Sequence, residues 1–287
     1  MRRLIVNADD FGLTAGVNRA ILELHAAGVV TSTTLMARGG AAEAAIEAAR
    51  NTPSLGVGCH VVLVDGESAL EASEIPTLVD AKTGRFRDTL NAFLMRLFAR
   101  RINAEEIEAE AAAQIAVLQS RGLRLTHVDT HKHTHMFPWV MRPVLRASRK
   151  AGISAVRNPF EPAWAVDATA GGKWARIAEV SALRRLESAC LRVIEEEGCV
   201  TTSGTVAVVG TGILNATTVR SLLTGLPEGT WELVTHPGYS DADLDKVRTR
   251  LRASRDVERE ALQSVKEFPE IELTNFGGLV AAETASS

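Results

Sequence analysis

Short apolar runs alternate along this chain with longer stretches of helical periodicity. The short runs predict strands at residues 3–7, 31–36, 57–64, 153–157, 205–209 and 231–235, with another strand running from residue 123 into His127. Apolar residues three and four positions apart predict helices at 16–27, 41–50, 105–121, 141–151 and 241–266, the last capped by Ser240. This alternation is typical of βα units around a parallel sheet, so we expect an α/β fold.

The length of 287 residues fits one such unit, because single α/β barrels commonly reach about 250 residues. We therefore expect a single domain over residues 1–287, with a lid or insertion at 160–200 and a frayed tail at 281–287. Trp164 and Trp174 lie in that insertion on either side of Gly171-Gly172. They are candidates for a mobile lid, and ordinary anchoring of a long connection is the alternative.

Ionisable residues stand directly after several of the predicted strands. Asp9 and Asp10 follow the first strand, His60 lies in the third, and His236 follows the strand at 231–235. The carboxyl ends of parallel strands converge in a barrel, so these distant positions can build one pocket there. A turn or a helix cap is the alternative for the two aspartates, and a turn is the alternative for His236 before Pro237.

The densest polar segment is residues 126–135, THVDTHKHTH, which holds four of the seven histidines. If the strand continues through it, alternation places His127, Asp129 and His131 on one face. Imidazole and carboxylate groups are the usual ligands of zinc and related divalent metals, so the segment predicts a metal-centred site. A solvated histidine-rich loop is the alternative.

Composition and charge narrow the classes of partner and compartment. A formal net charge of −3 offers no basic surface for nucleic acid, which is not an expected partner. Cys59, Cys190 and Cys199 lack CxxC spacing, so we expect neither a disulfide framework nor a thiolate metal site. The apolar run after Met1 is too short for a signal peptide, and no stretch approaches the about 20 apolar residues of a membrane helix. We expect a cytoplasmic protein.

Residues 86–101 combine an apolar stripe with basic neighbours. Leucines and phenylalanines recur at helical spacing between Leu90 and Phe98, and arginines surround them at positions 87, 96, 100 and 101. A basic amphipathic helix can lie on a membrane surface or cover an apolar substrate, so peripheral contact with the inner membrane face is one expectation. Packing on the barrel is the favoured alternative. The sequence also leaves a homodimer open.

Four ordered motifs resemble the YdjC-like carbohydrate deacetylase family. They are Asn7-Ala8-Asp9-Asp10-Phe11-Gly12, Gly58-Cys59-His60, the run from Thr126 to Pro138, and His236-Pro237. The resemblance covers most of the chain. It implies an irregular TIM-like (β/α) barrel with mostly parallel strands, and metal-dependent removal of acetyl groups from N-acetylated sugars.

The resemblance also implies roles for individual residues. The metal ligands would be Asp10, His60 and His131, the general base Asp9 and the acid His236. Lys132 stands where better-known members have the second of three consecutive histidines, so the middle position is no essential ligand here. The residues left for orienting the ligands or binding substrate are Asp129, His127, His133, His135 and Arg157.

The residue chemistry agrees with these roles. Three protein ligands leave a position for water on one divalent ion, and the donor set suits zinc or magnesium. A free carboxylate beside a coordinated one can accept the water proton, and an imidazole with a pKa near about 6.5 can protonate the departing amine. Asp129 is a candidate to orient a ligating histidine, because metal-bound imidazoles usually donate their second N–H.

The expected substrate is an N-acetylglucosamine-type sugar or glycolipid. Residues 62–66 and 131–135 most resemble the hopanoid-biosynthesis-associated subgroup, which implies a glycosylated hopanoid intermediate. Three alternatives stay open: a chitooligosaccharide deacetylase, another metal-dependent barrel hydrolase of the amidohydrolase or phosphoesterase type, and a non-catalytic metal- or lipid-binding protein.

Overall fold

Parallel strands form a nearly closed barrel in the computed structural model, which describes residues 1–286. The strand order is β6-β5-β4-β3-β2-β1-β8-β7, and β9 pairs with the first half of β1. This arrangement confirms the predicted α/β barrel. The strands are β1 (Arg2–Phe11), β2 (Ser32–Leu35), β3 (Gly56–Val61), β4 (His127–Thr130), β5 (Ala155–Val156), β6 (Val200–Thr201), β7 (Gly204–Val206), β8 (Gly229–Thr235) and β9 (Glu272–Thr274).

One extended run completes the ring. β6 and β7 are separated only by Thr202 and Ser203, yet β6 pairs with β5 and β7 pairs with β8. The backbone N–H of Ser203 also donates to the carbonyl of Thr230. Residues 200–206 therefore join the two edges of the sheet, and the sequence predicted only the second half of this run.

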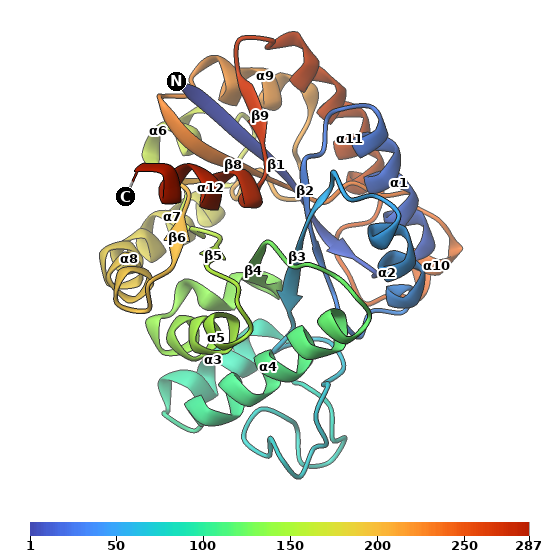
Figure 1. The fold of residues 1–287 in the computed structure, drawn as a ribbon, viewed down its shortest axis with the longest axis vertical. Coiled ribbons are helices and arrows are strands. Elements are labelled where there is room, and N and C mark those ends of the chain that lie inside the picture. Colours follow the sequence, from blue (N-terminus) through green and yellow to red (C-terminus); the bar gives the residue numbers. More distant parts are fainter. Residues whose placement is uncertain (287) are drawn as a thin grey trace.

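Helices surround the strands (Figure 1). The sequence predicted α1, α2, α4 and α5 to within a few residues. The helices are α1 (Ala15–Ala26), α2 (Ala42–Arg50), α3 (Leu90–Phe98), α4 (Ala104–Ser120), α5 (Pro138–Lys150), α6 (Ala163–Ala168), α7 (Trp174–Leu183), α8 (Glu187–Glu196), α9 (Ala216–Thr224), α10 (Ala242–Lys246), α11 (Ala253–Ala261) and α12 (Phe276–Ser286), with the 3₁₀ segments η1 (His131–Met136), η2 (Arg184–Leu186) and η3 (Leu262–Glu267).

The amino end of the barrel is filled by an aromatic contact between β4 and α12. The His127 ring stacks on Phe276 with centroids 3.8 Å apart, and Phe276 packs with Ile5 and Ala155. Burial lowers the pKa of His127 to about 3, so its ring is neutral. His127 therefore lies among packing residues at this end of the barrel.

Replacing Gly58 by alanine is expected to lower the free energy of unfolding by about 1–3 kcal/mol through overpacking. A Cβ at this position would lie 2.5 Å from Cε1 of His127, and that ring is already held against Phe276. Urea unfolding measures the effect. The matched control is Gly40→Ala, where the new Cβ would lie 3.4 Å from the carbonyl of Leu13 and nothing has to move. Equal urea midpoints for the Gly58 and Gly40 variants would contradict the tight packing of Gly58 against the His127 ring.

The predicted helix at 241–266 is wrong, because the segment divides into α10, α11 and η3. The N-cap of α10 is Asp241 rather than Ser240, and its carboxylate accepts from the backbone N–H of Asp243 and Leu244. The guanidinium of Arg252 donates to the carbonyls of Leu244 and Val247, where a continuing helix would supply backbone donors. Side-chain capping thus ends α10 and allows the chain to turn before α11.

Two further segments differ in detail from the expectations. The segment expected to be a lid or insertion, residues 160–200, is mostly helical, and Trp164 packs edge-on against Trp231 of β8 while Trp174 is exposed. The expected frayed tail at 281–287 continues α12 up to Ser286, and residue 287 lies outside the described residues. Within the described part of the chain, no helix is both long and apolar enough to cross a membrane.

Candidate metal centre and active site

A bulge in β1 allows two consecutive aspartates to serve one site. Strand alternation sends neighbouring side chains to opposite faces, but the pairing of β1 with β2 shifts register between Ala8 and Phe11. Asp10 has a φ of +66°, in the left-handed region that non-glycine residues rarely adopt. This local distortion places Asp9 inside the barrel and turns Asp10 toward β3 and β4.

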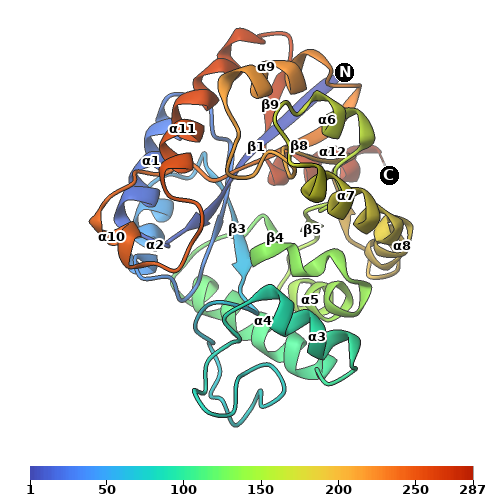
Figure 2. The same cartoon turned by 180° about the vertical axis from the view of Figure 1, so that it is seen from behind.

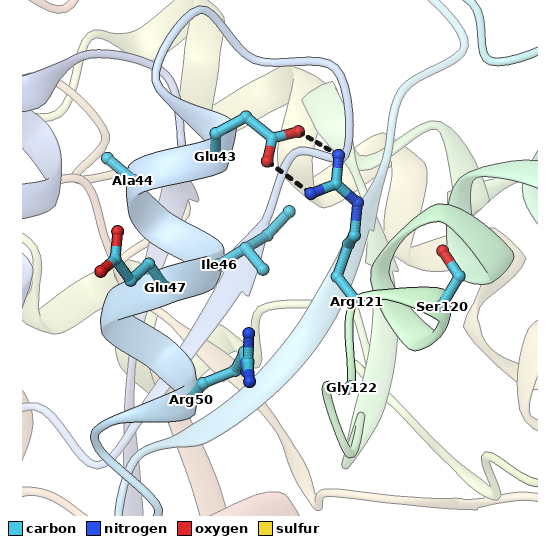
Figure 3. Close-up of a pocket in the computed structure, with 8 residues that line it drawn as sticks. All are labelled: Glu43, Ala44, Ile46, Glu47, Arg50, Ser120, Arg121 and Gly122. Atoms are coloured by element: carbon cyan, nitrogen blue, oxygen red, sulfur yellow. Dashed lines mark hydrogen bonds and ion pairs between the residues drawn. The ribbon is translucent and has the colours of Figure 1, made fainter.

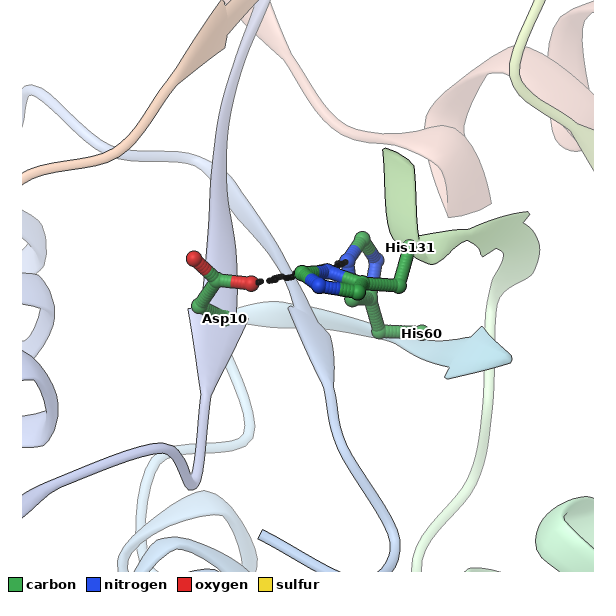
Figure 4. Close-up of side chains that lie close together, drawn as sticks. All are labelled: Asp10, His60 and His131. Atoms are coloured by element: carbon green, nitrogen blue, oxygen red, sulfur yellow. Dashed lines mark hydrogen bonds and ion pairs between the residues drawn. The ribbon is translucent and has the colours of Figure 1, made fainter. Parts of the chain in front are cut away.

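Asp10, His60 and His131 converge from three different segments (Figure 4). Oδ1 of Asp10 lies 3.6 Å from Nε2 of His60 and 3.4 Å from Nδ1 of His131, and the two imidazole nitrogens are 3.3 Å apart. Asp10 and His60 are buried, whereas the His131 side chain is 19% exposed and forms the open side of the cluster.

These distances fit a divalent metal. Ligand atoms arranged tetrahedrally at zinc-ligand distances are about 3.4 Å apart. Oδ1 of Asp10 is buried and has no hydrogen-bond partner among residues 1–286, as expected of an atom that binds a cation. Asp9, His60 and Asp129 also bring donor atoms together, but both oxygens of Asp9 are engaged by Arg157. The first group is therefore the better metal site.

Asp129 orients His60 from behind. Nδ1 of His60 donates to Oδ1 of Asp129 across 2.7 Å, which directs Nε2 toward Asp10 and His131. Burial alone would lower the pKa of His60, but Asp129, together with Asp9 and Asp10, raises the pKa to about 9. A metal bound here would displace a proton from His60.

Replacing His60 by alanine is expected to weaken zinc binding by more than the about 10–100-fold that loss of an outer-sphere partner costs. The variant removes one of the three donor atoms and leaves Asp129 without its imidazole partner. Calorimetric titration of chelator-treated protein with zinc measures the affinity. His25→Ala is the control, because the His25 imidazole bonds Val30 and Ser54 and takes no part in the three-residue group. Wild-type affinity in the His60 variant would refute this ligand set.

Arg157 forms a buried ion pair with Asp9 inside the barrel. Its guanidinium is fully buried and forms two hydrogen bonds with the Asp9 carboxylate, at 2.6 and 2.9 Å. Burial alone would raise the pKa of Asp9, but the charge and hydrogen bonds of Arg157, together with the nearby His60 and His236, hold that pKa well below its usual range. Asp9 is therefore ionised at neutral pH. Arg157 forms a buried ion pair and is not exposed for direct contact with a substrate.

The same guanidinium reaches two more carboxylates. Nε of Arg157 donates to Glu232 across 2.8 Å, and Nη1 pairs with Asp129. Burial raises the pKa of Glu232 to about 7 against the opposing charge of Arg157. Arg157, which directly follows β5, thus forms ion pairs with carboxylates on β1, β4 and β8. This network fixes the position of Asp9.

His236 lies beside Asp9, and α11 supports both sides of the site. Nε2 of His236 is 3.7 Å from Oδ2 of Asp9. The backbone N–H of His236 donates to Glu258, and the buried guanidinium of Arg255 pairs with Oδ2 of Asp10. Arg255 and Glu258 are three positions apart on α11, so one turn of this helix contacts both Asp10 and His236.

The other histidines of the run lie outside the three-residue group. His135 is buried, with Nδ1 2.7 Å from the Thr130 hydroxyl, and burial lowers its pKa to about 3. His133 is half-buried, and its Nδ1 has no hydrogen-bond partner within the described part of the chain. Lys132, which follows His131 in a left-handed conformation, pairs with Asp65 of the segment after β3. At the position where better-known family members have the second of three consecutive histidines, this chain therefore has a lysine that forms an ion pair with a neighbouring loop.

Glu232, Arg255 and Glu258 were missed by the sequence reasoning. Glu232 is the one carboxylate in the apolar run Trp231–Val234, and this isolation was a usable signal. Arg255 and Glu258 lie in a helix rich in charged residues, where no pattern distinguishes a buried charge from an exposed one. Arg255 and Glu258 can be distinguished from the exposed charged residues of α11 only once the packing of this helix on the barrel is known.

A surface hollow of about 780 Å³ lies elsewhere, between α2 and the end of α4 (Figure 3). The bidentate ion pair between Glu43 and Arg121 spans it. The carboxyl end of α4 leads into the amino end of β4, whereas the site residues gather at the carboxyl ends of the strands. None of the site residues lines this hollow, so we do not assign it to the active site.

Comparison with known proteins identifies the family. The profile described as YdjC-like protein matches residues 3–270. The chain belongs to this family. The YdjC-like fold is also similar to a crystal structure from Enterococcus faecalis V583, provisionally named a cellobiose-phosphate cleavage protein, with 28% identity, a TM-score of 0.75 and coverage of 97% of this chain and 98% of that one.

Curated relatives of this YdjC-like protein carry the name carbohydrate deacetylase. The protein from Brevibacillus brevis is 40% identical over 158 residues, which cover 55% of this chain and 60% of the relative. The protein from Thermoanaerobacter pseudethanolicus is 27% identical over 265 residues, covering 91% of each chain. The alignment with the Brevibacillus relative thus spans less than two thirds of that protein, while the alignment with the Thermoanaerobacter relative spans 91% of it.

Proposed function

We propose that this YdjC-like protein is a metal-dependent N-deacetylase of a sugar of the N-acetylglucosamine type. The observation that carries the proposal is the three-residue group Asp10, His60 and His131, whose donor atoms lie at metal-ligand spacing beside Asp9 and His236. The name shared by the curated relatives supports the carbohydrate substrate.

The reaction adds water to the acetamide carbonyl and breaks the C–N bond, releasing acetate and a free amine. A divalent ion held by Asp10, His60 and His131 would supply acidification of a water molecule and polarisation of the carbonyl. Asp9 accepts the proton of the attacking water, because its carboxylate is ionised and lies beside the ligand group. His236 donates a proton to the departing nitrogen, which leaves as the amine.

Arg157 and α11 position these groups. The two hydrogen bonds from Arg157 fix the plane of the Asp9 carboxylate, while Arg255 holds one oxygen of Asp10 and leaves the other directed at the two histidines. Glu258 fixes the backbone of His236 through its N–H. The base, the acid and a ligand are therefore held by buried partners, which favours a preorganised site.

For the sugar's carrier we propose a glycosylated hopanoid lipid intermediate rather than a free chitooligosaccharide. The support is the resemblance of residues 62–66 and 131–135 to the hopanoid-associated subgroup. In the structure these two segments lie together, because Lys132 pairs with Asp65. The pair sits directly beside His131, so the segments that carry the resemblance border the candidate centre.

Acetate release from two substrates tests both parts of the proposal, the deacetylase reaction and the hopanoid carrier of the sugar. Chelator-treated protein, with and without added zinc or magnesium, is incubated with N-acetylglucosaminyl hopanoid and, separately, with chitobiose. Metal-dependent release from the hopanoid substrate alone supports both parts. Release from chitobiose alone keeps the deacetylase and removes the hopanoid, and release from neither substrate overturns the deacetylase in favour of another metal hydrolase or a binding protein.

A further inference from the structure

An exposed aromatic surface adjoins the segment that carries His131. Met95, Phe98 and Trp139 are 70%, 57% and 56% exposed, and they are three of only eight large apolar side chains with high exposure in the described residues. Phe98 contacts Trp139 edge-on, with ring centroids 6.4 Å apart, and Met95 lies one helical turn before Phe98. We call Met95, Phe98 and Trp139 the α3–α5 patch.

The patch is fixed to the barrel from beneath. Phe93 and Leu97 of α3 are buried in the core, which accounts for two of the five residues of the apolar stripe seen in the sequence. Phe98 also packs edge-on against Phe137, the residue directly after η1, with centroids 5.4 Å apart. The exposed side chains are therefore held on a rigid base and are not a fraying helix end.

The surroundings of the patch are basic. Residues 90–103 contain Arg96, Arg100 and Arg101 and no aspartate or glutamate. None of these three arginines has an ion pair with any described residue, whereas Arg142 and Arg146, further along α5, pair with Glu196 and Glu197. The patch therefore combines unpaired positive charge with exposed apolar and aromatic groups.

The position of the patch relates it to the candidate centre. α5 follows β4 through η1, so the first turn of α5, with Trp139, lies at the carboxyl end of β4, where the site residues gather. In Figure 2, α3 lies in front of α4 and α5, and in Figure 1 it lies behind them. A surface that docks here would approach the protein at the same end of the barrel as His131.

We infer that the α3–α5 patch binds the surface of an anionic lipid bilayer. Tryptophan favours the bilayer interface, where its ring lies in an apolar layer and its N–H stays hydrated, and phenylalanine and methionine add apolar surface that can enter the lipid. Arginines close to an anionic leaflet each increase partitioning by about fivefold. The charge is complementary to such a surface, and association by this patch is peripheral because it needs no spanning helix. The inference does not depend on which reaction the protein catalyses.

Sedimentation with vesicles tests the inference. The full chain is mixed with vesicles of phosphatidylcholine alone and with vesicles containing equal amounts of phosphatidylcholine and phosphatidylglycerol, at low and high salt. We expect binding to the anionic vesicles only, weakened by salt. Replacing the three patch residues by serine should abolish it, and replacing the three arginines by glutamine should reduce it by about 100-fold. Brominated lipid should quench the fluorescence of wild-type protein more than that of Trp139→Phe.

Matched controls separate the patch from general effects. Trp174→Ser removes a tryptophan from α7 that is even more exposed than Trp139, at 82%. The triple change of Arg185, Arg192 and Arg250 to glutamine removes three exposed arginines without ion pairs among the described residues. Thermal unfolding of every variant checks the fold. The inference is overturned if wild-type protein does not bind, if the controls lose as much binding as the patch variants, or if the patch variants alter only self-association in sedimentation velocity.

Discussion

Asp9→Asn is expected to reduce acetate release by about 10²–10⁴-fold while the protein keeps its metal. The amide cannot accept the proton of the attacking water, but it keeps the shape of the carboxylate. Asp9 is not one of the three donor residues Asp10, His60 and His131, so their spacing should persist. Steady-state kinetics on the substrate that releases acetate, with zinc content measured on the same samples, gives both quantities.

The matched control for this variant is Glu232→Gln. Both changes remove one carboxylate from the Arg157 guanidinium, but only Asp9 lies beside His236 and Asp10. A general-base role requires a much larger loss for Asp9→Asn than for Glu232→Gln. If the two variants lose activity equally, Asp9 acts only through the charge balance of Arg157, and its assignment as the base is wrong.

Arg157→Leu is expected to lower the free energy of unfolding by about 3–5 kcal/mol, the cost of leaving buried carboxylates without their counter-charge. Asp9, Asp129 and Glu232 all direct oxygens at this one guanidinium, whose side chain is 0% exposed. Arg157→Lys should recover part of the stability but little of the activity, because an ammonium group cannot form the two parallel bonds with Asp9. Urea unfolding and acetate release measure the two effects.

Arg121→Leu provides the contrast for that experiment. Arg121 also binds a carboxylate through two bonds, of 2.8 Å each to Glu43, but its side chain is 52% exposed. Solvent-exposed ion pairs contribute about 0–1 kcal/mol to the free energy of unfolding, so the midpoint of urea unfolding should hardly change. Similar losses for Arg121→Leu and Arg157→Leu would show that burial of the Arg157 network is not the source of its effect.

Periodic features were predictable from the sequence, and features that depend on a local irregularity were not. Alternating apolar runs located β1, β3 and β8, and helical spacing located α1 and α4. The bulge at Asp9 and Asp10 leaves no mark in the pattern, because it arises from one residue in a left-handed conformation. The break between α10 and α11 depends on side-chain capping by Arg252, which spacing alone does not specify.

The candidate site shows the same division. Strand ends located Asp9, Asp10, His60 and His236, since a parallel barrel brings these ends together. Arg157 was visible as a candidate, but its three partners come from β1, β4 and β8, and only the closed ring places them around one guanidinium. Such contacts depend on strand order and register, which a single sequence does not contain.

The position of Arg255 and Glu258 on one turn of α11 has a consequence for how this protein can change. Asp10 belongs to β1 and His236 follows β8, so the proposed metal ligand and the proposed proton donor come from distant parts of the chain. Because one outer helix contacts both residues, we expect a displacement of α11 to change metal affinity and proton donation together. In the proposed enzyme, a substitution on α11 that tunes one of these properties would therefore have to preserve the other.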